Sequence, residues 1–232
     1  MISLRKASSR GHVQHGWLES WHSFSFADYY DPANTRFGAL RVINEDIVQP
    51  GTGFDTHGHR DMEILTYVLS GTLRHRDSMG NGGDLRYGDI QVMSAGLGVQ
   101  HSEVNPSQDE AVHLLQIWIL PERQGLKPGY SQKHFPVQDK LGRWCLLASP
   151  DAEQGSLAIH QGVRVLAAKL DGAQELEYRL AAGRKAYLHI ARGSLQANGH
   201  ALSAGDALTY VEEDRIALGG AQEAEVLLFD LA

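Results

Sequence analysis

Short apolar runs recur along the whole chain, and they constrain its fold more than any other feature. Residues 63–69 read EILTYVL and residues 114–120 read LLQIWIL, both rich in β-branched or aromatic side chains. Clusters of glycine, asparagine and aspartate, such as residues 80–84, separate the runs. Runs of this length and composition predict strands joined by tight turns. Further runs of the same kind lie at residues 23–26, 40–43, 89–93, 144–148, 162–166, 186–191 and 226–231.

No stretch shows the periodicity of a long helix, so the sequence predicts an all-β fold, built as a sandwich or a barrel. The 25 glycines suit a chain with many turns. Residues 121–143 interrupt the strand pattern, because they are polar and contain three of the seven prolines. We expect this segment to connect two domains.

The second half of the chain carries a faint signature of the first half. GTL at residues 71–73, followed by GD at 88–89, resembles GSL at 193–195, followed by GD at 205–206. A chain of 232 residues is long enough for two modest domains. We therefore interpret the repeat as a duplicated β-domain.

Charge and composition exclude several classes of function. The net charge is −7 and no dense block of lysine and arginine occurs, which argues against nucleic-acid binding. No run approaches the ~20 apolar residues of a membrane span, and the first residues lack the apolar core of a secretory signal. Cys145 is the only cysteine, so an intrachain disulfide and a thiolate zinc site are excluded. We expect a cytoplasmic protein without membrane or nucleic-acid partners.

Two short patterns place pairs of metal-capable side chains two residues apart: His57-Gly58-His59 and His101-Ser102-Glu103. In an extended strand, side chains at i and i+2 point to the same face, with Cα atoms about 6–7 Å apart. Two strands presenting one pair each can surround one ion with three imidazoles and one carboxylate. That donor set is typical of a divalent first-row transition metal with open coordination positions.

The fourth ligand has two candidates, Glu103 and Glu63. Along a straight strand, Glu63 would lie about 13 Å from His59. It would reach the ion only if the polar residues 58–61 turned the chain back. Glu103 needs no such bend and is favoured, and Glu63 is expected to orient a ligand imidazole from behind.

Other histidines are interpreted as structural. His75 and Asp77 form a further i, i+2 pair, but the turn-forming SMGN that follows predicts a hairpin tip, with solvation or turn hydrogen bonds for both. The cluster of His12, His15 and His22 with Trp17, Trp21 and nearby aromatic residues could line a pocket, but core or interface packing is the favoured interpretation.

Several segments together resemble the pirin family of the cupin superfamily. These are residues 15–32, 38–71, 75–81 and 88–106, which cover nearly the whole first half. Residues 148–161 and the short second half are similar to the bacterial pirin-like quercetin 2,3-dioxygenases. Ser94 stands where most cupins have proline, and four residues rather than two separate Gly96 from His101. Both departures are themselves pirin-like.

The resemblance implies a bicupin of two antiparallel β-barrel or jelly-roll domains. Residues 1–130 would form the metal-binding domain, and residues 131–232 the linker and a second cupin domain without ligands. Aligned on its glycines, the repeat places the ligand positions of the first half on Arg179, Ala181, Leu218 and Gly220. The implied ligands are the four chosen above by strand parity: His57, His59, His101 and Glu103.

The implied activity is the opening of the central ring of a flavonol such as quercetin by O₂, with release of carbon monoxide. Glu103, the only anionic ligand, is the expected proton acceptor and catalytic residue. The ligand set accepts one divalent cation per chain, with iron expected and Zn, Ni, Co, Mn or Cu as alternatives. Phe24, Phe26, Phe37 and Met93 are candidate walls for the flat substrate.

Two alternatives to the enzyme stay open. Eukaryotic pirins resemble the first half equally well and act as metal-dependent, redox-dependent co-regulators of transcription factors, which implies a protein partner. A purely structural ion is disfavoured, because structural zinc sites usually include cysteine.

Overall fold

The computed structural model describes all 232 residues, and its regular structure consists of strands and three short 3₁₀ turns. The turns span Ala7–Ser9, Val137–Asp139 and Glu153–Gly155. The predicted all-β class is therefore confirmed. No helix in the structure is both long enough and apolar enough to cross a lipid bilayer.

The chain divides into two compact units. The N-terminal unit comprises Arg10–Phe135 and Leu157–Gln161, and the C-terminal unit comprises Met1–Ser9, Pro136–Ser156 and Gly162–Ala232. The predicted domain division at residue 130, with its assignment of metal binding to the first domain, stays a prediction.

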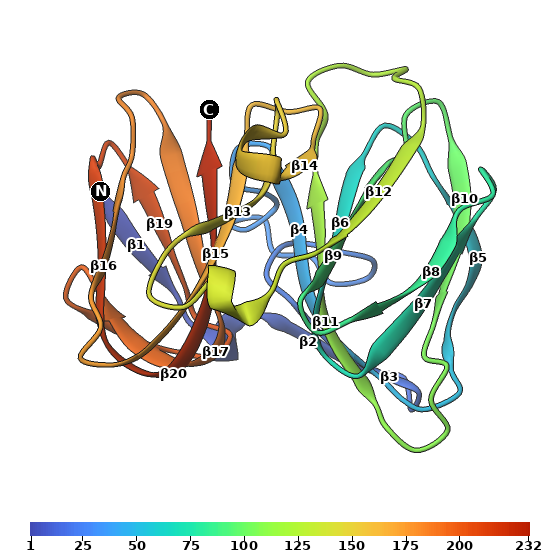
Figure 1. The fold of residues 1–232 in the computed structure, drawn as a ribbon, viewed down its shortest axis with the longest axis horizontal. Coiled ribbons are helices and arrows are strands. Elements are labelled where there is room, and N and C mark those ends of the chain that lie inside the picture. Colours follow the sequence, from blue (N-terminus) through green and yellow to red (C-terminus); the bar gives the residue numbers. More distant parts are fainter. The chain divides into compact units, whose positions relative to one another are not determined.

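Two sheets form the N-terminal unit (Figure 1). One has the order β12-β9-β6-β11-β4-β3-β2, and the other has the order β5-β10-β7-β8. The strands of the first sheet are β2 Gly11–Gln14, β3 Leu18–His22, β4 Leu40–Val48, β6 Glu63–Ser70, β9 Asp89–Ser94, β11 Val112–Ile119 and β12 Gly129–His134. Those of the second are β5 Gly53–His59, β7 Thr72–Asp77, β8 Gly82–Arg86 and β10 Val99–Val104. The short β14, Leu157–Ala158, belongs to neither of these two sheets.

The C-terminal unit has a matching strand order. Its main path runs β1-β19-β17-β20-β15-β13, with β16 on β20 and β18 on β17. The order β16-β20-β17-β18 corresponds to β5-β10-β7-β8, and β1-β19-β17-β20-β15-β13 corresponds to β12-β9-β6-β11-β4-β3. The strands are β1 Ile2–Arg5, β13 Cys145–Ser149, β15 Arg164–Gly172, β16 Leu176–Arg179, β17 Lys185–Ala197, β18 His200–Ser203, β19 Ala207–Val211 and β20 Arg215–Leu231.

This correspondence supports the internal repeat, and it shows what fills the second copy. On β16 and β20, where the first unit has its histidine strands, Leu176 pairs with Leu218 and Tyr178 pairs with Ile216. All four belong to, or pack against, one large apolar core cluster. On β16 and β20, apolar burial therefore stabilises the C-terminal unit. The corresponding strands of the N-terminal unit, β5 and β10, carry histidines instead.

Two sequence predictions differ from the structure. Residues 23–26 do not form a regular strand, because Ser25 uses its hydroxyl and amide in a turn: its Oγ lies 2.9 Å from both the carbonyl oxygen and the amide nitrogen of Asp31. Side-chain bonds to nearby backbone compete with the strand ladder in this way. The expected connection at residues 121–143 contains β12, which pairs with β9 along its whole length.

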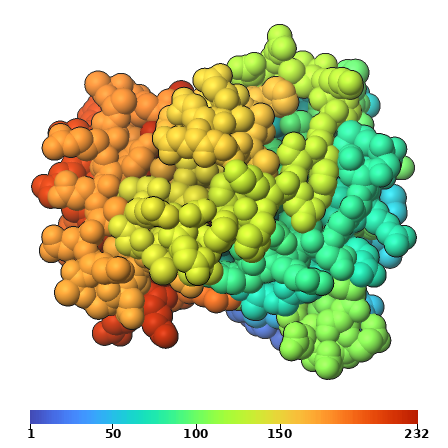
Figure 2. Space-filling model, viewed as in Figure 1, coloured from blue at the N-terminus to red at the C-terminus, as the bar shows by residue number.

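A loop at residues 105–111 follows β10 and forms a rounded green knob at the lower right of the space-filling view (Figure 2). Asn105 anchors this loop, because its side-chain amide donates hydrogen bonds to the carbonyl oxygens of Val48 and Glu110. The backbone amide of Asn105 also bonds the carbonyl of Thr52. The end of β10 is thereby held next to the start of β5.

Candidate metal centre

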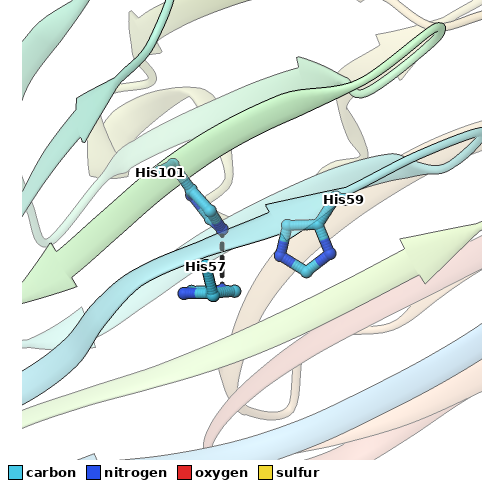
Figure 3. A group of neighbouring side chains, drawn as sticks. All are labelled: His57, His59 and His101. Atoms are coloured by element: carbon cyan, nitrogen blue, oxygen red, sulfur yellow. Dashed lines mark hydrogen bonds between the residues drawn. The ribbon is translucent and has the colours of Figure 1, made fainter.

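Three of the predicted ligands meet where β5 and β10 pair. His57 and His59 share a face of β5, and His101 on β10 is the direct antiparallel partner of His57. The ring centroid of His101 lies 4.4 Å from that of His57 and 4.8 Å from that of His59. Figure 3 shows the three imidazoles turned toward one another from the two strands. One nitrogen from each ring lies within 4.8 Å of the others.

A backbone hydrogen bond selects the tautomer of His57. Its Nδ1 lies 2.7 Å from the carbonyl oxygen of Asp55, so this nitrogen carries the proton and donates it. The lone pair is then on Nε2, which faces Nε2 of His101 at 3.0 Å. A ring oriented through its far nitrogen is the usual arrangement of a metal-ligating histidine.

The imidazoles of His59 and His101 are neutral at ordinary pH. Burial lowers the pKa of His101 to about 3, and repulsion from the neighbouring imidazoles in their protonated form adds to the fall. Burial and His57 lower the pKa of His59 to about 4 in the same way. A metal ion binds a neutral imidazole, so the rings of His59 and His101 can each bind a cation without first losing a proton. The three imidazoles therefore fit a divalent first-row ion.

Glu103 reaches the site through an irregularity in the strand pairing. Between His101 and Glu103 the register of β10 against β5 shifts, so that Glu103 lies opposite Phe54 rather than Asp55. Such bulges re-aim side chains. One carboxylate oxygen of Glu103 lies within 4.8 Å of one ring nitrogen of His75 and of one ring nitrogen of His101. The four predicted ligands thus fall in two overlapping groups that share His101, and their common coordination of one ion stays a prediction.

Three polar side chains hold the Glu103 carboxylate in the interior. Gln91 donates to Oε1 at 3.0 Å, Gln116 donates to Oε2 at 2.7 Å, and the hydroxyl of Thr66 lies 3.2 Å from Oε1. Burial raises the pKa of Glu103 to about 7, with the nearby Asp46 carboxylate adding to the rise and the three hydrogen bonds opposing it. A carboxyl group with this pKa exchanges a proton readily near neutral pH.

His75 was missed as a candidate for this site. Its side chain is fully buried rather than solvated, with its ring stacked on Tyr130 at 4.7 Å and 5.4 Å from the ring of His101. The turn-bonding prediction is right for Asp77, which accepts hydrogen bonds from the backbone amides of Met79 and Asn81. The position of His75 follows from strand register, which places it directly opposite Glu103 in the β7–β10 pair and which the sequence alone does not give.

Glu63 does not orient a ligand imidazole, contrary to the sequence-based expectation. It opens β6 and is buried, and its Oε2 accepts hydrogen bonds from the hydroxyl of Ser94 at 2.8 Å and the backbone amide of His160 at 3.1 Å. The chain from His59 to Glu63 does turn, but the turn carries Glu63 to the β9 edge instead of back to the cluster. Glu63 therefore anchors residues 157–161 to their own unit.

A cavity of about 290 Å³ opens beside His57, His59 and Glu103. Of the four proposed wall residues only Phe26 lines it; Met93, for example, is buried in a core cluster with Ile64. Leu18, Phe54 and Trp118 form the rest of the apolar wall and were missed. The polar wall is formed by Ser20, His22, Asn44, Asp46 and Gln116.

The histidines of the aromatic N-terminal segment have different environments in the structure. His12 stacks on Trp21, with ring centroids 5.0 Å apart, but its side chain is exposed, so this is a surface contact and not the expected core packing. His22 instead lines the cavity, with its ring against Phe26 at 5.2 Å. Burial, with Arg10 nearby, lowers the pKa of His22 to about 4.

Two family models match most of the chain. Residues 3–119 match the family model described as Pirin, and residues 146–231 match the model described as Quercetinase C-terminal cupin domain. A protein of Escherichia coli K12 named quercetin 2,3-dioxygenase is 49% identical over 100% of this chain and 99% of its own length. A pirin-like protein of Caulobacter vibrioides is 42% identical over the full length of both chains.

A solved structure with a similar sequence has the same fold. The bacterial pirin YhhW of Escherichia coli, in complex with nickel(II), superposes with a TM-score of 0.95 at 48% identity. The match covers 100% of this chain and 99% of that one.

Proposed function

The chain belongs to the pirin family, and from that premise we propose that it is a metal-dependent dioxygenase which opens the central ring of a flavonol such as quercetin with O₂ and releases carbon monoxide. The observation that carries the proposal is the meeting of His57, His59 and His101 at the edge of a cavity that Glu103 also lines. The dioxygenase name of the Escherichia coli relative supports the substrate class.

We propose His57, His59, His101 and Glu103 as the residues that hold one divalent ion. The nickel complex of the Escherichia coli pirin supports a first-row metal, and the imidazole and carboxylate donors suit iron equally well. When bound, such an ion acts as a Lewis acid that favours deprotonation of the 3-hydroxyl group and as a template for substrate and O₂.

Glu103 is the group that takes the proton from the 3-hydroxyl of the incoming flavonol. Its carboxylate is buried, lines the cavity and has a pKa raised toward neutrality by that burial. Gln91 and Gln116 hold the carboxylate in place through hydrogen bonds from two different strands. A base so positioned can accept a proton without a large rearrangement.

The apolar wall of the cavity suits a flat aromatic ligand. Phe26 meets Trp118 edge to face at 5.3 Å, and Trp118 meets the His59 ring at 4.9 Å. These rings form a continuous surface from the imidazole cluster into the cavity. Their role is to exclude water and to hold the planar rings next to the histidines.

The proposal is tested by O₂ uptake and by bleaching of the visible absorption of quercetin, with the chain purified without a histidine tag and loaded with iron or nickel. We expect stoichiometric metal and turnover, and loss of both in His101→Ala. Stoichiometric metal without O₂ uptake would contradict the enzyme. Metal-dependent retention of a protein partner would then favour the regulatory alternative.

A further inference from the structure

A row of polar side chains crosses the inner face of the large sheet of the N-terminal unit. Its members are direct partners on five neighbouring strands, and residues opposite each other in antiparallel strands point to the same face. We call it the polar row, in the order His22, Asn44, Gln116, Thr66 and Gln91.

The two ends of the polar row differ in their hydrogen bonding. Gln116, Thr66 and Gln91 all contact the Glu103 carboxylate. Asn44 and His22 lie on the far side of Gln116; the two residues are only 3% and 5% exposed, and both line the cavity. Buried polar atoms are almost always paired, yet Asn44 Oδ1 and His22 Nδ1 have no partner in the protein.

A buried carboxyl group lies beside this unpaired end. Asp46 occupies the next inward-facing position of β4 after Asn44, and it lines the same cavity. Ser20, its direct partner on β3, donates its hydroxyl to Asp46 Oδ1 at 2.5 Å. The wall of the cavity on this side therefore carries an amide, an imidazole and a carboxyl group, from Asn44, His22 and Asp46.

We propose that Asn44 and His22, with Asp46 beside them, form a subsite that hydrogen-bonds the hydroxyl groups on the ligand ring farthest from the imidazole cluster. The inference rests on the proposed function and names the ligand feature that this site selects: a planar polyphenol with a hydroxylated outer ring. A phenol hydroxyl both donates and accepts, so it pairs with the Asn44 amide in either orientation.

Distance along the sheet agrees with this assignment. Neighbouring strands are about 4.8 Å apart, which places Asn44 one strand and His22 two strands, or about 10 Å, beyond Gln116. A ligand whose reacting end faces Glu103 thus carries its outer ring toward these two side chains. A site built to hydrogen-bond a hydroxyl group rejects the analogue that lacks it.

Three flavonols test the subsite, because all share the 3-hydroxy-4-keto group and differ in the other hydroxyls. Quercetin has hydroxyls on both outer rings, galangin has them on one, and 3-hydroxyflavone has none. Dissociation constants are measured under nitrogen with the metal-loaded protein, and turnover is measured in air. For the wild type we expect quercetin to bind at least tenfold more tightly than 3-hydroxyflavone.

Two variants remove the hydrogen-bonding groups with little change of shape. Asn44→Leu deletes the amide, and His22→Phe keeps ring packing against Phe26. We expect each to weaken quercetin about tenfold and to leave 3-hydroxyflavone within twofold. Leu18→Ala is the matched control: it lines the same cavity and should weaken all three flavonols alike. Metal content and thermal unfolding establish that each variant is folded.

The outcomes separate the subsite from the function on which it rests. If flavonols bind and turn over but both variants keep the wild-type ratio of quercetin to 3-hydroxyflavone, the subsite is wrong and the enzyme stands. If the wild type neither binds nor oxidises any of the three flavonols, the proposed function fails and the subsite fails with it.

Discussion

Glu103 shows how one side chain acquires its chemistry from residues far away in the chain. Thr66, Gln91 and Gln116, on three different strands, supply its hydrogen bonds, while burial raises its pKa to about 7. The polar contacts favour the charged form and burial favours the neutral form. The balance leaves a group that can change charge near neutral pH.

Replacing this carboxylate tests its role as a base. Glu103→Gln keeps the size of the side chain but removes the proton acceptor, so we expect turnover of quercetin to fall roughly 10²–10⁴-fold, the usual contribution of general base catalysis. Single-turnover measurements on samples of equal metal content isolate this loss from weaker metal binding. Unchanged turnover at equal metal occupancy would exclude Glu103 as the base.

The raised pKa of Glu103 also predicts how metal affinity depends on pH. In the metal-free protein Glu103 holds its proton below a pKa of about 7, and a ligated carboxylate must release it. The pKa values of His59 and His101, about 4 and 3, leave these rings neutral down to about pH 5. Affinity should therefore fall by up to about tenfold per pH unit from 7 to 5 through Glu103.

Calorimetric titration in two buffers of different ionisation enthalpy measures the released proton. Glu103→Gln should bind metal with one proton fewer released at pH 6 than the wild type. An equal proton count in the variant and the wild type would contradict a ligating Glu103.

His75 is a second residue whose importance the structure shows. Its ring lies between Tyr130 and His101 and carries a buried Nδ1 without a partner. His75→Phe keeps the stacking but removes both nitrogens, and we expect metal affinity to fall about 10–100-fold, as for other residues that support a ligand. His12→Phe, on the exposed stack with Trp21, is the control and should leave metal affinity unchanged.

At the scale of the element, the pairing of β5 with β10 decides whether the imidazoles meet. His57 opposes His101 only because these strands are in register at that point, and the bulge that follows places Glu103 opposite Phe54. A slip by one residue would turn every side chain of the strand to the other face. Gly53 helps to set the register, since the backbone of Glu103 and Val104 fills the space of its missing Cβ.

A pair of glycine substitutions tests this arrangement. An added Cβ at Gly53 would lie 2.3 Å from the Glu103 carbonyl oxygen, whereas at Gly58 the nearest atom is 3.8 Å away. We expect Gly53→Ala to lower the unfolding midpoint and to weaken metal binding, because the two strands must separate. Gly58→Ala, on the same strand, should change neither by much. Equal effects of the two variants in thermal unfolding and metal titration would contradict this account.

At the scale of the whole molecule, two units of one strand order use their interiors differently. The N-terminal unit places histidines on β5 and β10, and the C-terminal unit places Leu176, Tyr178, Ile216 and Leu218 on the corresponding β16 and β20. On these strands the second unit gains apolar burial, whereas in the first unit the Nδ1 atoms of His75 and His101 are buried without a hydrogen-bond partner. A ligand that binds the folded state would therefore stabilise the first unit selectively.

Hydrogen exchange measures this selectivity within one molecule. A divalent ion at about 100 times its Kd should stabilise the N-terminal unit by about 2.7 kcal/mol. The amides of β5 and β10 should then exchange more slowly, while those of β16 and β20 provide an internal control and should not change. Equal protection of both units, or protection that persists in His101→Ala, would place the ion elsewhere.

The sequence alone determined those features that depend on local pattern. Strand-length apolar runs predicted the all-β class, and alternation along a strand predicted that His57 and His59 share a face. The repeat of GTL and GSL segments pointed to two similar units, and the family resemblance was confirmed by comparison. Each of these signals lies within a few residues, where the geometry of an extended chain leaves little freedom.

Only the tertiary structure decided which distant side chains share an environment. The burial of His75, the position of Glu63 beside Ser94 and the cavity wall of Phe54 and Trp118 depend on which strands are neighbours. The polar row joins residues from position 22 to position 116 through hydrogen-bonded register. Strand order and register are set by long-range packing, which no local pattern in the sequence encodes.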